Sequence, residues 1–143
     1  MIRHVASIAE IVDDFDAAVR FYRDALGLEV APKPDGNYAD VLVDGVAHFG
    51  IWRRSHAALT LFGDEAAALR VPLGFTIGFE ADAVAAGEAR LRSGGAAVVQ
   101  PTHAEPWGQT TCRYASPGGA VCELAETPWA RTLKSSVLVR GPA

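Results

Sequence analysis

The strongest constraint on the fold is an internal repeat marked by two pairs of helix boundaries. Asp14 and Asp82 lie 68 residues apart, as do Gly27 and Gly95, and each Asp and Gly pair brackets one helix-like segment. In the first segment, apolar residues recur at three- and four-residue spacing, which predicts a helix capped by Asp13 or Asp14 and stopped by Gly27. A repeat this long, present in two copies, is not a solenoid, so the sequence predicts a domain of two paired modules.

Strand-like segments flank each predicted helix in the same order. They are short, rich in β-branched and aromatic residues, and separated by turn residues such as Asp44-Gly45. The predicted strands cover residues 4–12, 38–44 and 46–54 in the first module and residues 73–82, 96–100, 110–115 and 120–126 in the second. The sequence therefore predicts an α+β fold built from two β-α-β-β-β modules.

The length of 143 residues fits one domain with a core of its own. Module one is predicted at about 1–55 and module two at 73–126. The linker 56–72 is expected to be a connecting loop with a helical turn, apolar enough to cover the modules. Residues 127–143 are predicted to form an extension on the surface or over a partner subunit.

Composition excludes several classes of function. The net charge is −4 and the 13 Lys and Arg form no block, which argues against nucleic-acid binding. No apolar run approaches the ~20 residues of a membrane span, and no apolar signal region begins the chain. Cys112 and Cys122 are predicted to be reduced core thiols, because a secreted scaffold of this size would carry more cysteines. These features predict a cytoplasmic protein that binds neither nucleic acid nor membranes.

Two stretches resemble one known family: the helix end "FYRDALGL" and the closing segment "PWGQ…SPGGAVCELAE". Together with the paired modules, they are similar to the vicinal oxygen chelate superfamily, which includes glyoxalase I, extradiol dioxygenases and the fosfomycin- and bleomycin-resistance proteins. The resemblance reaches to about residue 126. It implies a curved mixed sheet around a cavity, the glyoxalase/bleomycin resistance fold, and a homodimer.

The resemblance also implies where a metal would be bound. Metal-dependent members hold a divalent ion with two His and two Glu on corresponding strands. Ser7 and Thr76 stand at the two positions where those members have His. Strand 46–54 should carry one carboxylate and has none, so Glu123 is the one match to a family ligand. Hydroxyls replace imidazole poorly. The chain is thus expected to use no metal or other cofactor, although a register shift could offer His4 or Glu10 together with His48 and Glu123.

A metal-free cavity would bind its ligand by stacking and a few hydrogen bonds. Period-two alternation puts Thr76, Gly78 and Glu80 on the cavity face of their strand and Phe75, Ile77 and Phe79 under the second helix. For strand 46–54 the sequence does not show which face meets the cavity. The predicted ligand-binding residues are Ser7, His48, Phe49, Trp52, Thr76, Trp107, Gln109 and Glu123, with Phe62 and Tyr38 as further aromatic candidates.

Each of these residues has a plainer interpretation. The aromatic residues could be ordinary core, and Glu123 could be a structural carboxylate tied to Arg113. His56 and His103 are expected in solvated loops. Trp107 is the strongest pocket candidate because it sits in a Pro-Gly loop away from periodic core positions.

Three functions remain open from the sequence. The leading hypothesis is a non-catalytic protein of the bleomycin-resistance type that sequesters a small aromatic or peptide-like compound, an antibiotic among them. The alternative is a metal-dependent lyase, isomerase or dioxygenase with displaced ligands, and the third is an interaction module. No phosphate loop, nucleophile elbow or Cys-base pair is present in the sequence.

Overall fold

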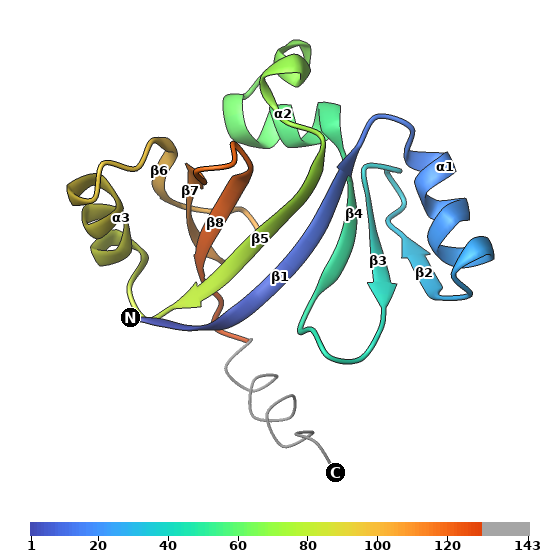
Figure 1. The fold of residues 1–143 in the computed structure, drawn as a ribbon, viewed down its shortest axis with the longest axis horizontal. Coiled ribbons are helices and arrows are strands. Elements are labelled where there is room, and N and C mark those ends of the chain that lie inside the picture. Colours follow the sequence, from blue (N-terminus) through green and yellow to red (C-terminus); the bar gives the residue numbers. More distant parts are fainter. Residues whose placement is uncertain (130–143) are drawn as a thin grey trace.

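Eight strands form one curved, open sheet in the computed structural model, which describes residues 1–129 (Figure 1). The strand order is β2-β3-β4-β1-β5-β8-β7-β6. The strands are β1 (Ile2–Val12), β2 (Glu29–Pro32), β3 (Tyr38–Leu42), β4 (Phe49–Arg53), β5 (Gly74–Ala81), β6 (Val98–Ala104), β7 (Thr110–Ala115) and β8 (Val121–Glu126).

The two predicted modules meet at the centre of this sheet. Their first strands, β1 and β5, pair antiparallel, and each also pairs in parallel with the last strand of its own module, β4 or β8. Helix α1 (Phe15–Arg20) and helix α3 (Val84–Ser93) lie toward opposite ends of the sheet (Figure 1). Both modules of one chain therefore build one sheet, and the predicted α+β fold of two β-α-β-β-β modules is confirmed.

Helix α1 (Phe15–Arg20) begins where the sequence predicts it. The Asp14 carboxylate accepts a hydrogen bond from the Ala17 N–H at 3.0 Å, which satisfies one of the free donors of the first turn. The helix continues as a π-helical segment, η1 (Phe21–Ala25), and ends before Gly27, whose φ of +73° suits glycine. Its apolar side covers β3 and β4 in a core formed by Phe15, Val19, Tyr22, Ala39, Val41 and Ile51.

Helix α3 (Val84–Ser93) starts differently from its counterpart. No side chain of its N-cap residue, Ala83, makes a capping hydrogen bond. The Val84 N–H instead donates to the Glu126 carboxylate of β8 at 2.6 Å, so a distant strand caps this helix. Val84 packs with the buried Cys112 and Leu124. Cys112 and Cys122 are both buried free thiols, as predicted.

The linker is more regular than expected. Residues 56–72, predicted as a loop with a helical turn, contribute to two helices, α2 (Arg54–Phe62) and the 3-10 helix η2 (Glu65–Arg70). The reason is tertiary packing. Ala57, Ala58 and Leu61 pack in one buried cluster with Ile11 and Val71, and this burial stabilises the helical conformation.

Within residues 1–129, every helix is too short or too polar to cross a membrane. Most of the predicted C-terminal extension, 127–143, lies outside the described residues.

Candidate functional site

The concave face of the sheet carries a cavity of about 820 Å³, here called the concave cavity. Strands of both modules line it, because side chains of alternate residues on each strand point to this face. All eight residues predicted to bind a ligand border it: Ser7, His48, Phe49, Trp52, Thr76, Trp107, Gln109 and Glu123. The structure thus brings the predicted set together, while their role in binding stays a prediction.

A row of side chains crosses the floor of the concave cavity. Ser7 pairs with Gly78, Gly78 with Glu123, and Glu123 with Arg113 across four neighbouring strands. A Cβ at Gly78 would lie 2.4 Å from the Ser7 Oγ and 3.7 Å from the Glu123 Oε1. The missing side chain at Gly78 therefore lets Ser7 and Glu123 converge over the same point of the sheet.

Glu123 is held by Arg113, which was the plainer of its two interpretations. The Arg113 Nη2 lies 2.8 Å from the Glu123 Oε2, and the Nη1 lies 2.8 Å from the Glu105 Oε1. The guanidinium is almost fully buried, with 4% of its side chain exposed. Burial raises the pKa of Glu123, against the opposing attraction of Arg113. A carboxylate so paired is a poor cation ligand, but its Oε1 still faces the cavity side of Gly78.

The remaining positions fit a metal ion no better. The Thr76 hydroxyl donates to the Val121 carbonyl, so it serves the sheet. Glu10, a candidate in the shifted register, points to the other face, where its Oε1 accepts the Tyr22 hydroxyl at 2.5 Å. Among residues 1–129, no group of three or more His, Cys, Asp and Glu side chains is placed to hold a metal. The donor set present thus does not match the ion that the family's metal-dependent members bind.

Aromatic side chains form the walls of the concave cavity. All three tryptophans of the chain, Trp52, Trp107 and Trp129, line it. The Trp52 Nε1–H donates to the His56 Nδ1 at 3.0 Å, and the Trp107 Nε1–H donates to the Gln109 Oε1 at 2.6 Å. These bonds fix the indole edges and leave the ring faces for stacking.

Trp107 lies at the mouth of the cavity, and a chain of hydrogen bonds within the protein holds its indole in place. Its side chain is half exposed. Gln109, which accepts the indole N–H, donates in turn to the Thr127 hydroxyl at 2.6 Å. Gln109 therefore orients Trp107, so its amide is largely engaged within the protein rather than free for a ligand.

A polar cluster occupies the β3 and β4 side of the concave cavity. The Tyr38 hydroxyl lies 2.7 Å from the His48 Nε2, and the two rings stack at 5.6 Å. Asp40 lies 2.9 Å from the Lys33 Nζ and 3.5 Å from the His48 Nε2. Burial lowers the pKa of His48 and raises that of Tyr38. At neutral pH, the Tyr38 hydroxyl is thus hydrogen-bonded to a neutral imidazole.

Asp40 and Lys33 were missed by sequence reasoning. The signal for Asp40 was available, since Tyr38 and Asp40 alternate with the buried Ala39 and Val41 on β3. That pattern puts both polar side chains on the face away from α1, which is the cavity face.

Several aromatic and histidine residues differ from their predicted places. Phe49 borders the concave cavity, but its ring packs on the helix-covered face, edge-on to Tyr22 at 5.4 Å. Phe62 lies under the Arg70 guanidinium, 3.9 Å from ring centroid to Cζ, and packs with the core beneath α2. His56 is on α2 rather than in a loop, and it lines the cavity. His103 is on β6, 3.1 Å from the Glu105 carboxylate.

Comparison with known proteins identifies one family model that matches residues 2–124, described as the Glyoxalase/Bleomycin resistance protein/Dioxygenase superfamily. A comparison with curated proteins found no significant match. Among solved structures, a member of that superfamily from Vibrio splendidus 12B01 is 15% identical, with 89% of this chain and 100% of that chain covered and a TM-score of 0.62.

Two other similar structures are methylmalonyl-CoA epimerases. The Streptomyces coelicolor protein is 19% identical over 90% of this chain and 99% of that one, with a TM-score of 0.58. The Mycobacterium tuberculosis protein is 21% identical over 92% and 93%, with the same score. At these identities the likeness shows the fold.

Proposed function

Because the chain belongs to the Glyoxalase/Bleomycin resistance protein/Dioxygenase superfamily, we propose that it is a cytoplasmic small-molecule-binding protein. Its concave cavity takes an aromatic or peptide-like compound, an antibiotic among them, and holds it without a metal ion and without changing it chemically. The observation that carries this proposal is a cavity walled by indoles whose floor is the row Ser7, Gly78, Glu123 and Arg113.

Binding would rest on stacking. A cavity of several hundred Å³ accommodates a drug-sized ligand and buries most of its surface. Trp52 and Trp107 offer ring faces whose edges are already hydrogen-bonded, so little conformational freedom is lost when a flat ligand stacks on them.

Orientation would come from a few polar atoms. Ser7 and the Oε1 of Glu123 converge over Gly78 and can accept an amine, amide or hydroxyl hydrogen from the ligand. On the opposite wall, the His48 ring is nearly half exposed beside Tyr38 and Asp40. These anchors select hydrogen-bond donors at two ends of a stacked ring system.

Tryptophan fluorescence tests the proposal directly, because every tryptophan of the chain lines the concave cavity. Titration with a panel of glycopeptide and polycyclic aromatic compounds should quench or shift the emission saturably for at least one class. Trp107→Phe should weaken that binding. Phe62→Leu, which alters an aromatic residue outside the cavity, is the matched control and should leave it unchanged. No saturable change across the panel would contradict the proposal.

Metal analysis separates the binder from the enzymatic alternative. We expect the purified protein to retain no stoichiometric divalent ion, because the Glu123 carboxylate already forms an ion pair with Arg113. About one tightly held ion per chain, lost in Glu123→Ala, would favour a metal-dependent lyase, isomerase or dioxygenase instead.

A further inference from the structure

His56 stands beside Trp52 at the α2 end of the concave cavity. It lies in the first turn of α2, four residues after Trp52, and both side chains line the cavity. The Trp52 Nε1–H donates to the His56 Nδ1 at 3.0 Å. The other ring nitrogen, Nε2, has no hydrogen-bond partner among residues 1–129, and the side chain is half-buried. One edge of the imidazole is therefore held by the protein while the other stays available.

The bond to Trp52 fixes which nitrogen of His56 carries the proton. An indole N–H can only donate, so the Nδ1 that receives it must be unprotonated. In the neutral imidazole the proton then lies on Nε2. His48 differs, because its Nε2 lies beside the Tyr38 hydroxyl, which can donate or accept. His56 thus presents a hydrogen-bond donor, and no acceptor, at its free edge.

Other donors that line the concave cavity are engaged within the protein. The Trp107 indole N–H already has its acceptor. Lys33 and Arg113, the lysine and arginine that line the cavity within residues 1–129, are both ion-paired. A ligand carboxylate would therefore find no unpaired cation of this kind. A neutral carbonyl group needs only one donor, which the Nε2–H of His56 supplies.

The rings of His56 and Trp52 are placed to receive one flat ligand together. Their centroids lie 6.4 Å apart, and their planes are inclined at 62°. The imidazole therefore stands at the edge of the indole, out of its plane. A ring stacked on Trp52 would have His56 at its rim.

We propose that His56 selects ligands that carry a neutral carbonyl group at the edge of the ring stacked on Trp52, with its Nε2–H donating to the carbonyl oxygen. This inference rests on the proposed function and adds a requirement to it. Ser7 and the Oε1 of Glu123 select hydrogen-bond donors on the ligand. His56 requires an acceptor as well.

Selection of this kind comes from a penalty as much as from a gain. A carbonyl oxygen loses its water when the ligand enters the cavity, and a ligand without a carbonyl would cover the Nε2–H and leave it unpaired. A hydrogen bond of ordinary net strength changes an affinity by roughly fivefold.

Two probes built on one ring system test the inference. 2-Aminoanthraquinone and 2-aminoanthracene share their three fused rings and their amine, and only the quinone carries carbonyl groups. Equilibrium dialysis against the wild-type protein should give a dissociation constant roughly fivefold lower for the quinone. Burial of apolar surface alone favours the aminoanthracene, so a preference for the quinone requires a donor in the site.

Two substitutions of His56 separate its donor from its support of Trp52. In His56→Asn the side-chain oxygen can still accept the indole N–H, but nothing replaces the Nε2–H, so the preference for the quinone should disappear. In His56→Gln the amide N–H can reach the place of Nε2, so the preference should remain while both probes bind more weakly. A merely structural loss would weaken both probes without changing their ratio. Phe62→Leu, on the same helix but outside the cavity, is the control and should keep the preference.

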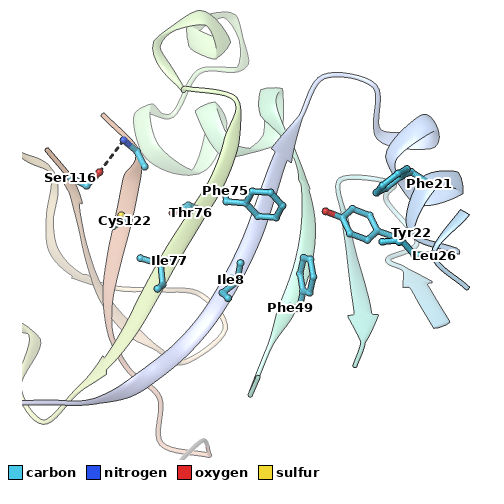
Figure 2. Close-up of a pocket in the computed structure, with 11 residues that line it drawn as sticks. Ile8, Phe21, Tyr22, Leu26, Phe49, Phe75, Thr76, Ile77, Ser116 and Cys122 are labelled. Atoms are coloured by element: carbon cyan, nitrogen blue, oxygen red, sulfur yellow. Dashed lines mark hydrogen bonds between the residues drawn. The ribbon is translucent and has the colours of Figure 1, made fainter. Parts of the chain in front are cut away.

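A second hollow, of about 780 Å³, lies on the opposite face of the sheet and is bordered by Phe21, Phe49 and Phe75 (Figure 2). It can hold an aromatic probe by apolar contact. The Tyr22 hydroxyl that lines it already donates to Glu10 at 2.5 Å, so binding there would show no preference for the quinone. Phe75→Asp puts a charge at this hollow and should leave the preference unchanged.

Four results would overturn the inference. Wild-type protein that binds the aminoanthracene as tightly as the quinone would reject selection by His56 and leave the proposed binding function in place. A preference that survives in His56→Asn would assign the carbonyl group to another donor, and one that is lost in Phe75→Asp would place it in the second hollow. Binding of neither probe would remove the inference together with the stacking on which the proposed function rests.

Discussion

Gly50→Ala should damage the concave cavity, although alanine usually suits a strand better than glycine. Gly50 is on β4, and the Tyr38 ring lies across it to reach His48. A Cβ at Gly50 would lie 1.8 Å from the Tyr38 hydroxyl oxygen and 2.2 Å from the Cζ. Ordinary contacts need about 3.5 Å, so the ring must move by more than 1 Å. Glycine is required at position 50 because the Tyr38 ring occupies the space that a side chain there would fill.

The cost follows from what Tyr38 loses. Its hydrogen bond to His48 is worth about 1 kcal/mol, and its stacking on the same ring about 0.5–1.5 kcal/mol. Replacing a strand glycine by alanine returns about 0.5–1 kcal/mol. We therefore expect Gly50→Ala to lower the free energy of unfolding by about 1 kcal/mol. The same substitution at an unhindered strand glycine would raise it.

Denaturant unfolding followed by circular dichroism measures this change, and two further variants isolate its cause. Gly118→Ala is the matched control, because a Cβ there meets nothing within 4 Å and no loss is expected. In a Tyr38→Ala background the clash is gone, so Gly50→Ala should be neutral or stabilising. An equal loss in both backgrounds would refute the reasoning, as would a stabilised single variant.

Three other predictions concern charge. Arg113→Met leaves buried carboxylates without their cation and should lower the free energy of unfolding by about 3–5 kcal/mol in denaturant unfolding, whereas the same change paired with Glu123→Gln should cost less. Hydrogen bonds from Thr102 lower the pKa of Glu88 to about 2. The stabilisation by the Glu88 carboxylate should therefore be complete above the ordinary Glu pKa near 4.5 and be lost as the pH falls toward 2. Acid unfolding of Glu88→Gln should lack this loss of stability. Burial lowers the pKa of His48, so stability should drop as the pH falls below the ordinary His value of about 6.5, and His48→Gln should flatten this part of the thermal stability profile.

The fold followed from the sequence because both modules carry local signals. Asp14 caps α1 and Gly27 ends it, as the spacing predicts. The linker helix α2 was missed because its start has no capping side chain and its stability comes from burial of Ala57 and Leu61 against another part of the chain. Such helices are decided by tertiary packing, which a local pattern does not contain.

The site was predicted only as far as strand alternation reaches. Thr76 and Gly78 border the concave cavity, as their alternation indicates. Phe75 lies on the opposite face, but the prediction that it packs under the second helix is wrong: it is 58% exposed, and its ring lies beside Phe49 of β4 instead. On β4 the alternation was equally clear, but the choice of face depends on α1, which buries Ile51 and so turns His48 and Trp52 toward the cavity. The facing of a strand between two layers is fixed by its neighbours rather than by its own residues.

The partnership of Glu123 explains why a single surviving family residue is weak evidence for chemistry. A carboxylate in a metal site is useful because a divalent ion balances its charge. Here Arg113 supplies that balance from the next strand, and Glu105 holds the same guanidinium from the other side. Glu123 thus has a cationic partner within the protein, so a ligand does not need to bring a cation to enter the cavity. Under the proposed function, recognition would depend on the shape and stacking of the ligand, and the indoles of Trp52 and Trp107 line the cavity.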